Sequence, residues 1–353
     1  GLRRNRGVSV LGERMPSLRL AAALVLTALL GLAPAAADEK PASPRDDIFP
    51  MSAVRPGMKG YGLTVKQGTK IERFEVEVID IIRNHLVKQD VILVRCLGEA
   101  FADHQIAQGM SGSPIYFDGK LAGALAYTWS QAKHPIGGVT PIEIMLAEGD
   151  RKLEGRAPGM LPRTRLRRGD PKPIASSTEL RPIGTPITVA GFSAASRQAL
   201  AAEFAPQGFT VCGGGAAAGG PMKGAQWVNL DAPMEPGGSI VVDLLRGDYS
   251  ASALGTCTHV DGKKVYGFGH EFNLLGETLL PMSVGYVYTI LASRDISFKL
   301  GSSIRQVGAL VQDRPACIVG HLGKAAEDLG ISRTTLWRKM KRHGLSPAEY
   351  RAS

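Results

Sequence analysis

The sequence predicts a mainly β protein of two modules, followed by a short helical tail. A chain of 353 residues is long enough for about two domains. Its short apolar runs are separated by Gly- and Asp-containing turn signals, which is the pattern of strands joined by hairpins. Helical periodicity is sparse and is restricted to 142–146, 194–204 and the tail. The 43 Gly and 22 Pro are together less than a fifth of the chain, which excludes a low-complexity or collagen-like protein.

The first module is expected over residues 38–149. Residues 74–81 approximate the alternation of apolar and polar side chains that a half-buried strand shows. Residues 114–117 and 121–127 flank Asp118-Gly119-Lys120, and glycine tolerates the positive φ that a tight hairpin turn needs. This part of the chain is therefore predicted to consist of short strands.

The second β module is expected over residues 183–322. It contains an apolar run at 239–245 and a further hairpin signal at Asp261-Gly262. Residues 150–182 between the modules are basic and rich in proline, with no sustained hydrophobic period. They are predicted to form a linker.

The net charge of +10 is concentrated in three segments. Residues 1–14, 151–172 and 324–353 carry net charges of +3, +6 and +4, so the rest of the chain carries −3. The charge of the globular body therefore gives no reason to expect a polyanion-binding protein.

The amino-terminal residues 1–37 are expected to be upstream sequence followed by a secretory signal peptide. From Met15, the chain has a basic residue, Arg19, then an apolar run over 20–32 and a small-residue site ending at Ala37. The alternative is an uncleaved anchor or a buried helix. A signal peptide predicts export, to the periplasm or the extracellular space.

The cysteines give no sign of a metal site. Cys96, Cys212, Cys257 and Cys317 are widely spaced and form no CxxC pair, so a zinc site is not expected. Neither a metal nor an organic cofactor is predicted. The four cysteines can form disulfides or stay as buried free thiols, and the sequence does not choose between these.

The segment Gly-Met-Ser-Gly-Ser-Pro at 109–114 has the composition of a nucleophile turn. A nucleophilic serine needs a tight turn, which the flanking glycines allow, and Ser111 is the candidate. The same turn can direct the N–H groups of Gly109 and Ser111 at one point, as an oxyanion hole. The alternative is that this Gly- and Ser-rich segment only makes a tight turn before a strand.

This segment resembles the nucleophile turn of chymotrypsin-like proteases, and more closely that of the SpoIVB peptidase family. The likeness continues at 68–77 upstream and at 118–124 and 138–146 downstream. The resemblance implies two chymotrypsin-like β-barrels with the active site between them. It also implies that Ser111 is the nucleophile, that Gly109 belongs to the oxyanion hole, and that the substrate is a protein or peptide.

A serine nucleophile needs a base that titrates near neutrality, which is usually histidine. Among seven histidines, His270 follows the predicted strand 263–268, whose end contains glycines. Residues 255–258 and 266–270 resemble the family's segment around its catalytic histidine. In that family the histidine segment precedes the serine segment, whereas His270 follows Ser111 by 159 residues. We therefore expect the two barrels in permuted order, because a triad is defined by geometry and not by chain order.

The acid of the triad is not identified by the sequence. In the family it lies fifteen residues before the serine, and that position is Cys96 here. Asp248 in the histidine module is the first choice for the acid, and Asp103 is the second.

The tail, 323–353, resembles a Fis-type helix-turn-helix whose recognition helix spans 332–343. Arg333, Thr334 and Arg338 are its candidate DNA contacts, and DNA is a partner only if the tail is native and cytoplasmic. The alternative is a basic amphipathic helix on the surface. Because an exported chain does not meet the chromosome, we interpret 324–327 as a junction introduced in the gene or in sequence assembly.

These observations favour an exported serine endopeptidase that acts through an acyl-enzyme. Two other functions remain open. One is a non-catalytic, degenerate β-barrel binding module, which Cys96 at the acid position favours. The other is a DNA-binding regulator, which the tail alone favours.

Overall fold

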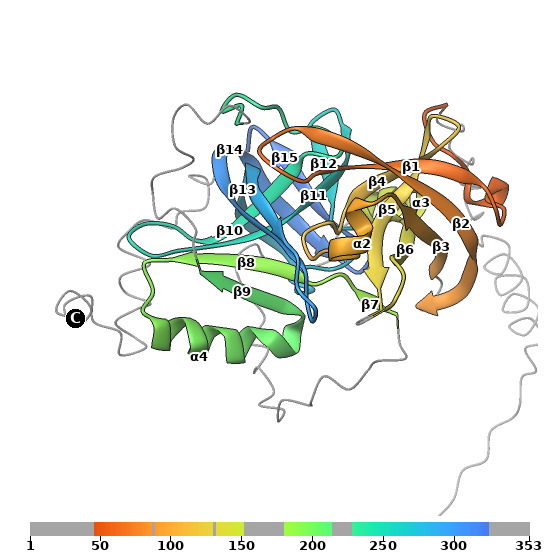
Figure 1. The fold of residues 1–353 in the computed structure, drawn as a ribbon. Helices are drawn as coiled ribbons and strands as arrows, with labels where there is room; N and C mark the ends of the chain where they lie inside the picture. Colours follow the sequence, from red (N-terminus) through yellow and green to blue (C-terminus); the bar gives the residue numbers. More distant parts are fainter. Residues whose placement is uncertain (1–45, 87–88, 130–131, 152–179, 214–227, 325–353) are drawn as a thin grey trace, which may run out of the picture. The chain divides into compact units, whose positions relative to one another are not determined.

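The computed structural model describes residues 46–86, 89–129, 132–151, 180–213 and 228–324 (Figure 1). These residues belong to the compact unit Arg45–Ser353. Most of them lie in two β-sheets, so the prediction of a mainly β protein is confirmed. The predicted helical tail and the amino-terminal segment lie outside the described residues.

The first sheet closes into a ring of six antiparallel strands in the order β4-β1-β2-β3-β6-β5, because β4 also pairs with β5. A seventh strand, β7, pairs with the outer end of β5. The strands of this sheet are β1 (Lys59–Val65), β2 (Ile71–Leu86), β3 (Gln89–Leu97), β4 (Ser113–Phe117), β5 (Lys120–Thr128), β6 (Ile136–Pro141) and β7 (Arg181–Pro182).

The second sheet contains a second ring of six antiparallel strands, β10-β13-β14-β15-β12-β11, closed by the pairing of β10 with β11. Two more strands extend it, because β8 pairs with β11 and β9 runs parallel to β8. Its strands are β8 (Thr185–Ala190), β9 (Phe209–Gly213), β10 (Ser239–Leu245), β11 (Ser250–Asp261), β12 (Lys264–Gly267), β13 (Gly276–Leu291), β14 (Phe298–Arg314) and β15 (Cys317–Leu322).

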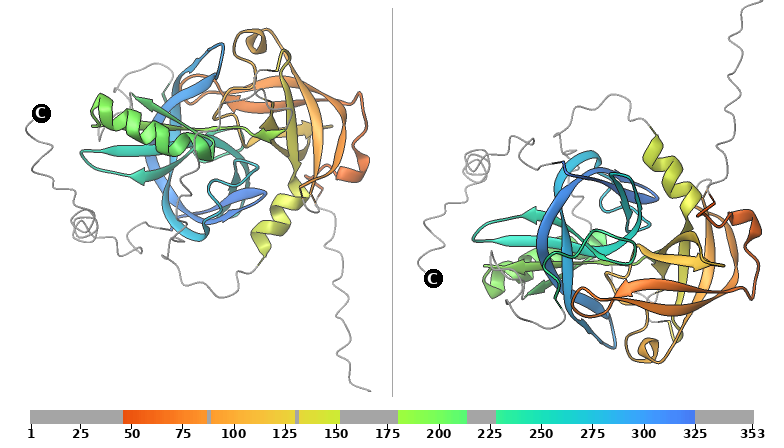
Figure 2. Two further views of the ribbon diagram at one scale, coloured as in Figure 1. Left: turned by 90° about the horizontal axis from the view of Figure 1, so that it is seen from below. Right: turned by 90° about the horizontal axis from the view of Figure 1, so that it is seen from above.

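The helices of the described residues are short. They are α2 (Ala100–His104), α3 (Ile142–Asp150), α4 (Ala194–Phe204) and the 3-10 turns η1 (Met51–Ala53) and η2 (Ala205–Gln207). Helix α3 packs at the junction of the two sheets (Figure 2). There, Met145 shares one apolar cluster with Leu121 of β5 and Val319 of β15. Within the described residues, none of the helices has the length and apolar character needed to cross a membrane.

Local sequence explains several of these elements. Asp118 and Gly119 both have positive φ, 49° and 76°, which is the conformation of a two-residue hairpin turn between β4 and β5. The predicted runs 239–245 and 194–204 coincide with β10 and α4. Two residues of the expected linker, Arg181–Pro182, are β7 and pair with β5.

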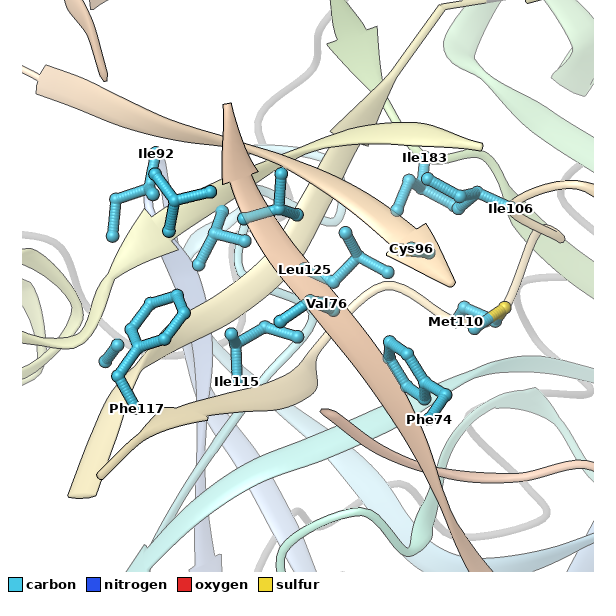
Figure 3. Packing of buried hydrophobic residues seen from close by; sticks show 14 of the residues in the cluster. Phe74, Val76, Ile92, Cys96, Ile106, Met110, Ile115, Phe117, Leu125 and Ile183 are labelled. Atoms are coloured by element: carbon cyan, nitrogen blue, oxygen red, sulfur yellow. The ribbon is translucent and has the colours of Figure 1, made fainter. Parts of the chain in front are cut away.

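The first ring encloses an aliphatic and aromatic core (Figure 3). Phe74, Val76, Ile115 and Phe117 from its strands point into this core. The loop between α2 and β4 also contributes, through the fully buried Met110. Burial of the residue next to Ser111 fixes the loop that carries the serine, because a buried apolar side chain is held by the free energy of its removal from water.

All four cysteines are buried free thiols. The sequence left open whether these residues form disulfides, and in the structure none of the four is disulfide-bonded.

Candidate active site

Ser111 lies in a tight turn between α2 and β4. Gly109 and Gly112, on either side of it, have φ values of 87° and 91°, which favour glycine. The turn is closed by the N–H and the hydroxyl of Ser113, which both donate to the Met110 carbonyl. These contacts explain why the sequence has glycines at these two positions and a serine after them.

The Ser111 turn is bound to β11 of the second sheet. The N–H of Thr256 donates to the Ser111 carbonyl at 2.8 Å, and the Thr256 hydroxyl donates to the Gly109 carbonyl at 3.0 Å. The Thr258 hydroxyl donates to the Gly112 carbonyl at 2.8 Å. A Cβ at Gly112 would lie 2.0 Å from the Thr256 carbonyl oxygen, so only glycine allows this approach.

The side chain of Ser111 is fully buried, and its Oγ has no hydrogen-bond partner within the described residues. A buried hydroxyl without a partner is energetically unfavourable and calls for an explanation. A group held ready for a ligand or a reaction is one such explanation.

His270 lies in a turn after β12 that contacts the first sheet. Gly269, just before it, has a φ of 73°, and a Cβ there would lie 2.8 Å from the Cβ of Ala124 in β5. The Thr140 hydroxyl of β6 donates to the Gly269 carbonyl at 2.6 Å. The histidine-bearing turn of the second sheet is thus fixed directly on the sheet that carries Ser111.

The imidazole of His270 is held in the tautomer that a general base requires. Its Nδ1 lies 2.6 Å from the carbonyl oxygen of Glu271, which can only accept, so Nδ1 carries the proton. The other nitrogen, Nε2, then has a free lone pair, and it too has no hydrogen-bond partner among the described residues. Burial lowers the pKa of His270, and the Glu271 carbonyl, the charge of Asp313 and the Ile183 carbonyl oppose that shift.

The structure therefore brings the serine turn and the histidine turn into contact without a hydrogen bond between the two side chains. One link between the turns is at Gly112, where a Cβ would lie 2.5 Å from the backbone nitrogen of Phe268. Hydrogen bonds between catalytic groups are often long or poorly aligned before a substrate binds.

The two acids predicted from the sequence are exposed, whereas Ser111 and His270 are buried. Asp248 lies in the exposed turn between β10 and β11, and Asp103 is exposed in α2. Neither is hydrogen-bonded to His270, whose Nδ1 is bound to Glu271. Their role as the triad acid stays a prediction. Cys96 lies in the apolar core of the first ring, and burial raises the pKa of its thiol to about 12 (Figure 3).

Asp313 of β14 is a carboxylate near His270 that the sequence analysis did not single out. Only 1% of its surface is exposed, and it accepts the backbone N–H groups of Phe272, Asn273 and Leu275, each at 2.8 Å. Burial raises its pKa, against these three donors. Asp313 thereby orders the loop after His270. No local motif marks it, because its partners lie about forty residues away in sequence.

Lys299 of β14 is a second buried group that the sequence analysis missed. Its Nζ donates to the hydroxyls of Thr64 in β1 at 2.7 Å and of Thr256 in β11 at 3.2 Å. The side chain is completely buried, and this burial lowers the pKa of the amine to about 7. Its methylene groups lie against Gly109, since a Cβ there would be 3.2 Å from the Lys299 Cβ.

The Gly109 amide, a predicted oxyanion-hole donor, already has an acceptor. It donates to the carbonyl of Gly184 at 3.3 Å. Gly184 belongs to residues 181–185, here called the strap. The strap includes β7, which pairs with β5, and leads to the first residue of β8. The strap also lines a pocket of about 300 Å³ together with His270, Glu271 and the loop 205–209.

The remaining sequence predictions concern metals and DNA. The described residues contain no cluster of His, Cys, Asp and Glu that could hold a metal ion. The candidate DNA contacts Arg333, Thr334 and Arg338 lie outside the described residues.

Residues 40–146 match the family model of SpoIVB peptidase S55. This match covers less than a third of the chain and includes Gly109 and Ser111 but not His270. Residues 319–343 match the Fis family of bacterial regulatory proteins, and the first of these, 319–322, are part of β15. Both resemblances inferred from the sequence are thus confirmed. No curated protein and no solved structure matches the chain.

Proposed function

We propose that this protein is an exported serine endopeptidase of the SpoIVB type, with Ser111 as the nucleophile and His270 as the general base. The observation that supports this most strongly is the pair of unpartnered buried atoms, Ser111 Oγ and His270 Nε2, on two turns in contact. An unprotonated Nε2 is the atom that can take the proton of a serine hydroxyl.

The reaction follows from these groups. Ser111 Oγ attacks the carbonyl carbon of the scissile peptide bond while its proton passes to His270 Nε2. The N–H groups of Gly109 and Ser111 stabilise the oxyanion of the tetrahedral intermediate. His270 then returns the proton to the leaving amine, and water hydrolyses the acyl-enzyme by the same steps in reverse. This scheme requires Ser111 Oγ and His270 Nε2 to come within hydrogen-bond distance of each other first.

The third group of the mechanism, Asp313, supports His270 and does not react itself. Asp313 stabilises the imidazolium through its negative charge and holds the loop that presents the Glu271 carbonyl to Nδ1. It is a positioning residue in this scheme, because it has no hydrogen bond to the imidazole.

A non-catalytic binding module is the second candidate. The complete burial of Ser111 and the engaged Gly109 amide favour it, since a working serine peptidase needs both groups accessible. The DNA-binding alternative has support only from the match of the tail.

The proposal is tested by treating the full chain with a fluorophosphonate probe, which reacts with activated serines. Labelling is expected at Ser111 and is expected to disappear in Ser111→Ala and His270→Ala. Hydrolysis of a protein mixture should be lost in the same variants. Labelling of wild type that persists in His270→Ala would contradict the assignment of the base.

A further inference from the structure

The strap follows β5 as an added antiparallel strand. Pro182 pairs with Tyr127 and Arg181 with Thr128. The Ile183 N–H then donates to the Ala126 carbonyl at 2.7 Å, and the Gly184 carbonyl accepts from Gly109. Four consecutive residues are thus bound mainly through the backbone, which is how a sheet edge binds an extended peptide.

One side chain of the strap is inserted into the first ring. Ile183 is 1% exposed and lies beside Ile106 in the apolar core, near Cys96 (Figure 3). Its neighbours Arg181 and Pro182 are exposed. The track along β5 therefore takes up the apolar side chain of Ile183, and Leu180 just before the strap also packs against Ala126 and Tyr127 of β5.

The strap also faces the histidine. It lines the same pocket as His270, and the Ile183 carbonyl lies close enough to the imidazole to raise its pKa. A peptide backbone thus lies between the candidate base and the candidate oxyanion-hole amide, where a scissile bond has to lie.

We propose that the strap is the resident occupant of the peptide-binding track, so that a peptide reaches the site only by competing with the strap. This inference rests on the proposed function and adds two points to it. The substrate is an extended peptide that binds along β5 with an aliphatic residue in the place of Ile183. Binding requires displacement of the strap.

The contacts of the strap are suited to such an exchange. The bond from Gly109 to Gly184 is 3.3 Å long, beyond the usual 2.9–3.0 Å of an N–H···O hydrogen bond. Its loss frees the amide that the oxyanion needs. Because the strap is part of the same chain, its effective concentration is high, on the order of millimolar for a flexible connection. A free peptide of equal intrinsic affinity therefore competes poorly until the strap is weakened.

Gly184→Val is the variant that weakens it. A Cβ at Gly184 would lie 2.3 Å from Gln108 Nε2 and 3.0 Å from the Gly208 carbonyl, so a valine requires a shift of the strap or of the Gln108 side chain that packs on it. Ile183→Ala is the second variant, because it removes the inserted side chain and leaves the backbone intact. Gly213→Val at the end of β9 is the matched control, where a Cβ would meet only the Arg197 side chain, at 3.2 Å or more.

The experiment measures binding of a fluorescent peptide with the sequence of residues 180–186 to full-length chains that carry Ser111→Ala, which removes turnover. Circular dichroism establishes that each variant is folded. We expect Gly184→Val and Ile183→Ala to bind the peptide at least about tenfold more tightly than the parent and the Gly213→Val control do. The reason is that each strap variant loses a contact with which the strap competes against the peptide. A peptide with Asp in place of its isoleucine should not bind.

The outcomes separate the two proposals. Equal binding by the parent and both strap variants, or binding by none of them, overturns the resident-occupant proposal whatever the fluorophosphonate probe shows. Tighter binding by the strap variants supports it. If the strap variants bind the peptide but the same variants with Ser111 restored react with no fluorophosphonate, the occupancy stands and the peptidase proposal fails.

Discussion

The backbone N–H of Thr256 donates to the carbonyl of Ser111 at 2.8 Å and joins the serine turn to the second sheet. The same residue donates its hydroxyl to Gly109 and accepts from Lys299. One residue of β11 thus fixes both ends of the turn that forms the candidate nucleophile and oxyanion hole. The position of Ser111 consequently depends on the contact between the sheets and not only on its own hairpin.

Thr256→Val tests this dependence. The substitution keeps the shape and the N–H but removes the hydroxyl, leaving the Gly109 carbonyl and the Lys299 amine without that partner. We expect a loss of about 1–3 kcal/mol in the free energy of unfolding, measured with urea, and slower labelling of Ser111 by fluorophosphonate. Thr188→Val is the matched control, because the Thr188 hydroxyl is buried and has no hydrogen-bond partner in the described part of the chain. An equal loss of stability in both variants would show that the Thr256 contacts contribute nothing specific.

Lys299 makes the stability depend on pH. Burial lowers the pKa of its amine from 10.5 to about 7, so between these values the unfolded chain binds more protons at this residue than the folded one. The contribution of Lys299 to stability is therefore lowest below pH 7 and rises as the pH increases towards 10.5. In the described part of the chain, the Nζ donates to two threonine hydroxyls and forms no ion pair with a carboxylate.

The measurement compares urea unfolding of wild type and Lys299→Met at pH 6, 7, 8 and 9. Other titrating groups are common to both chains, so the difference reports Lys299. The variant is expected to gain stability relative to wild type as the pH falls from 9 to 6. A constant difference across this range would show that the amine titrates at an ordinary pKa in the folded protein.

Asp313→Asn separates a role in positioning His270 from a role in folding. The amide still fills the space but accepts the N–H groups of Phe272, Asn273 and Leu275 less strongly than a carboxylate does. Because the charge of Asp313 raises the pKa of His270, its removal should lower that pKa further. We expect the labelling rate of Ser111 to fall by at least about tenfold and the acidic limb of its pH profile to move to lower pH.

Asp248→Asn and Asp103→Asn are the comparisons for this experiment. Both carboxylates are exposed, and neither contacts His270 in the hydrogen bonds of the described residues. A large loss of labelling in either variant, with Asp313→Asn unaffected, would restore the sequence-predicted acid.

The sequence was informative where a local signal decides the structure. The turns at Asp118-Gly119 and around Ser111 could be predicted, because the positive φ that each turn needs is a property of one or two residues. Asp313 and Lys299 gave no such signal, because their partners are distant in sequence and burial alone gives them their character. The strap was hidden for a related reason. A proline-containing segment next to a basic stretch resembles a linker, and its pairing with β5 depends on a sheet edge more than fifty residues earlier.

Cys96→Asp tests whether the position of the family's acid can serve that role in this fold. The Cys96 side chain is 1% exposed and packs among Val76, Ile106 and Leu125 in the first ring (Figure 3). An aspartate there would have to lose its hydration or its charge, so we expect a loss of at least about 3 kcal/mol in the free energy of unfolding and no gain in Ser111 labelling. Cys96→Ser, which adds a polar group of similar size without a charge, should lose less. Stable folding of Cys96→Asp with faster labelling would mean that residue 96 can reach His270, and that the thiol at this position limits the reactivity of Ser111 in wild type.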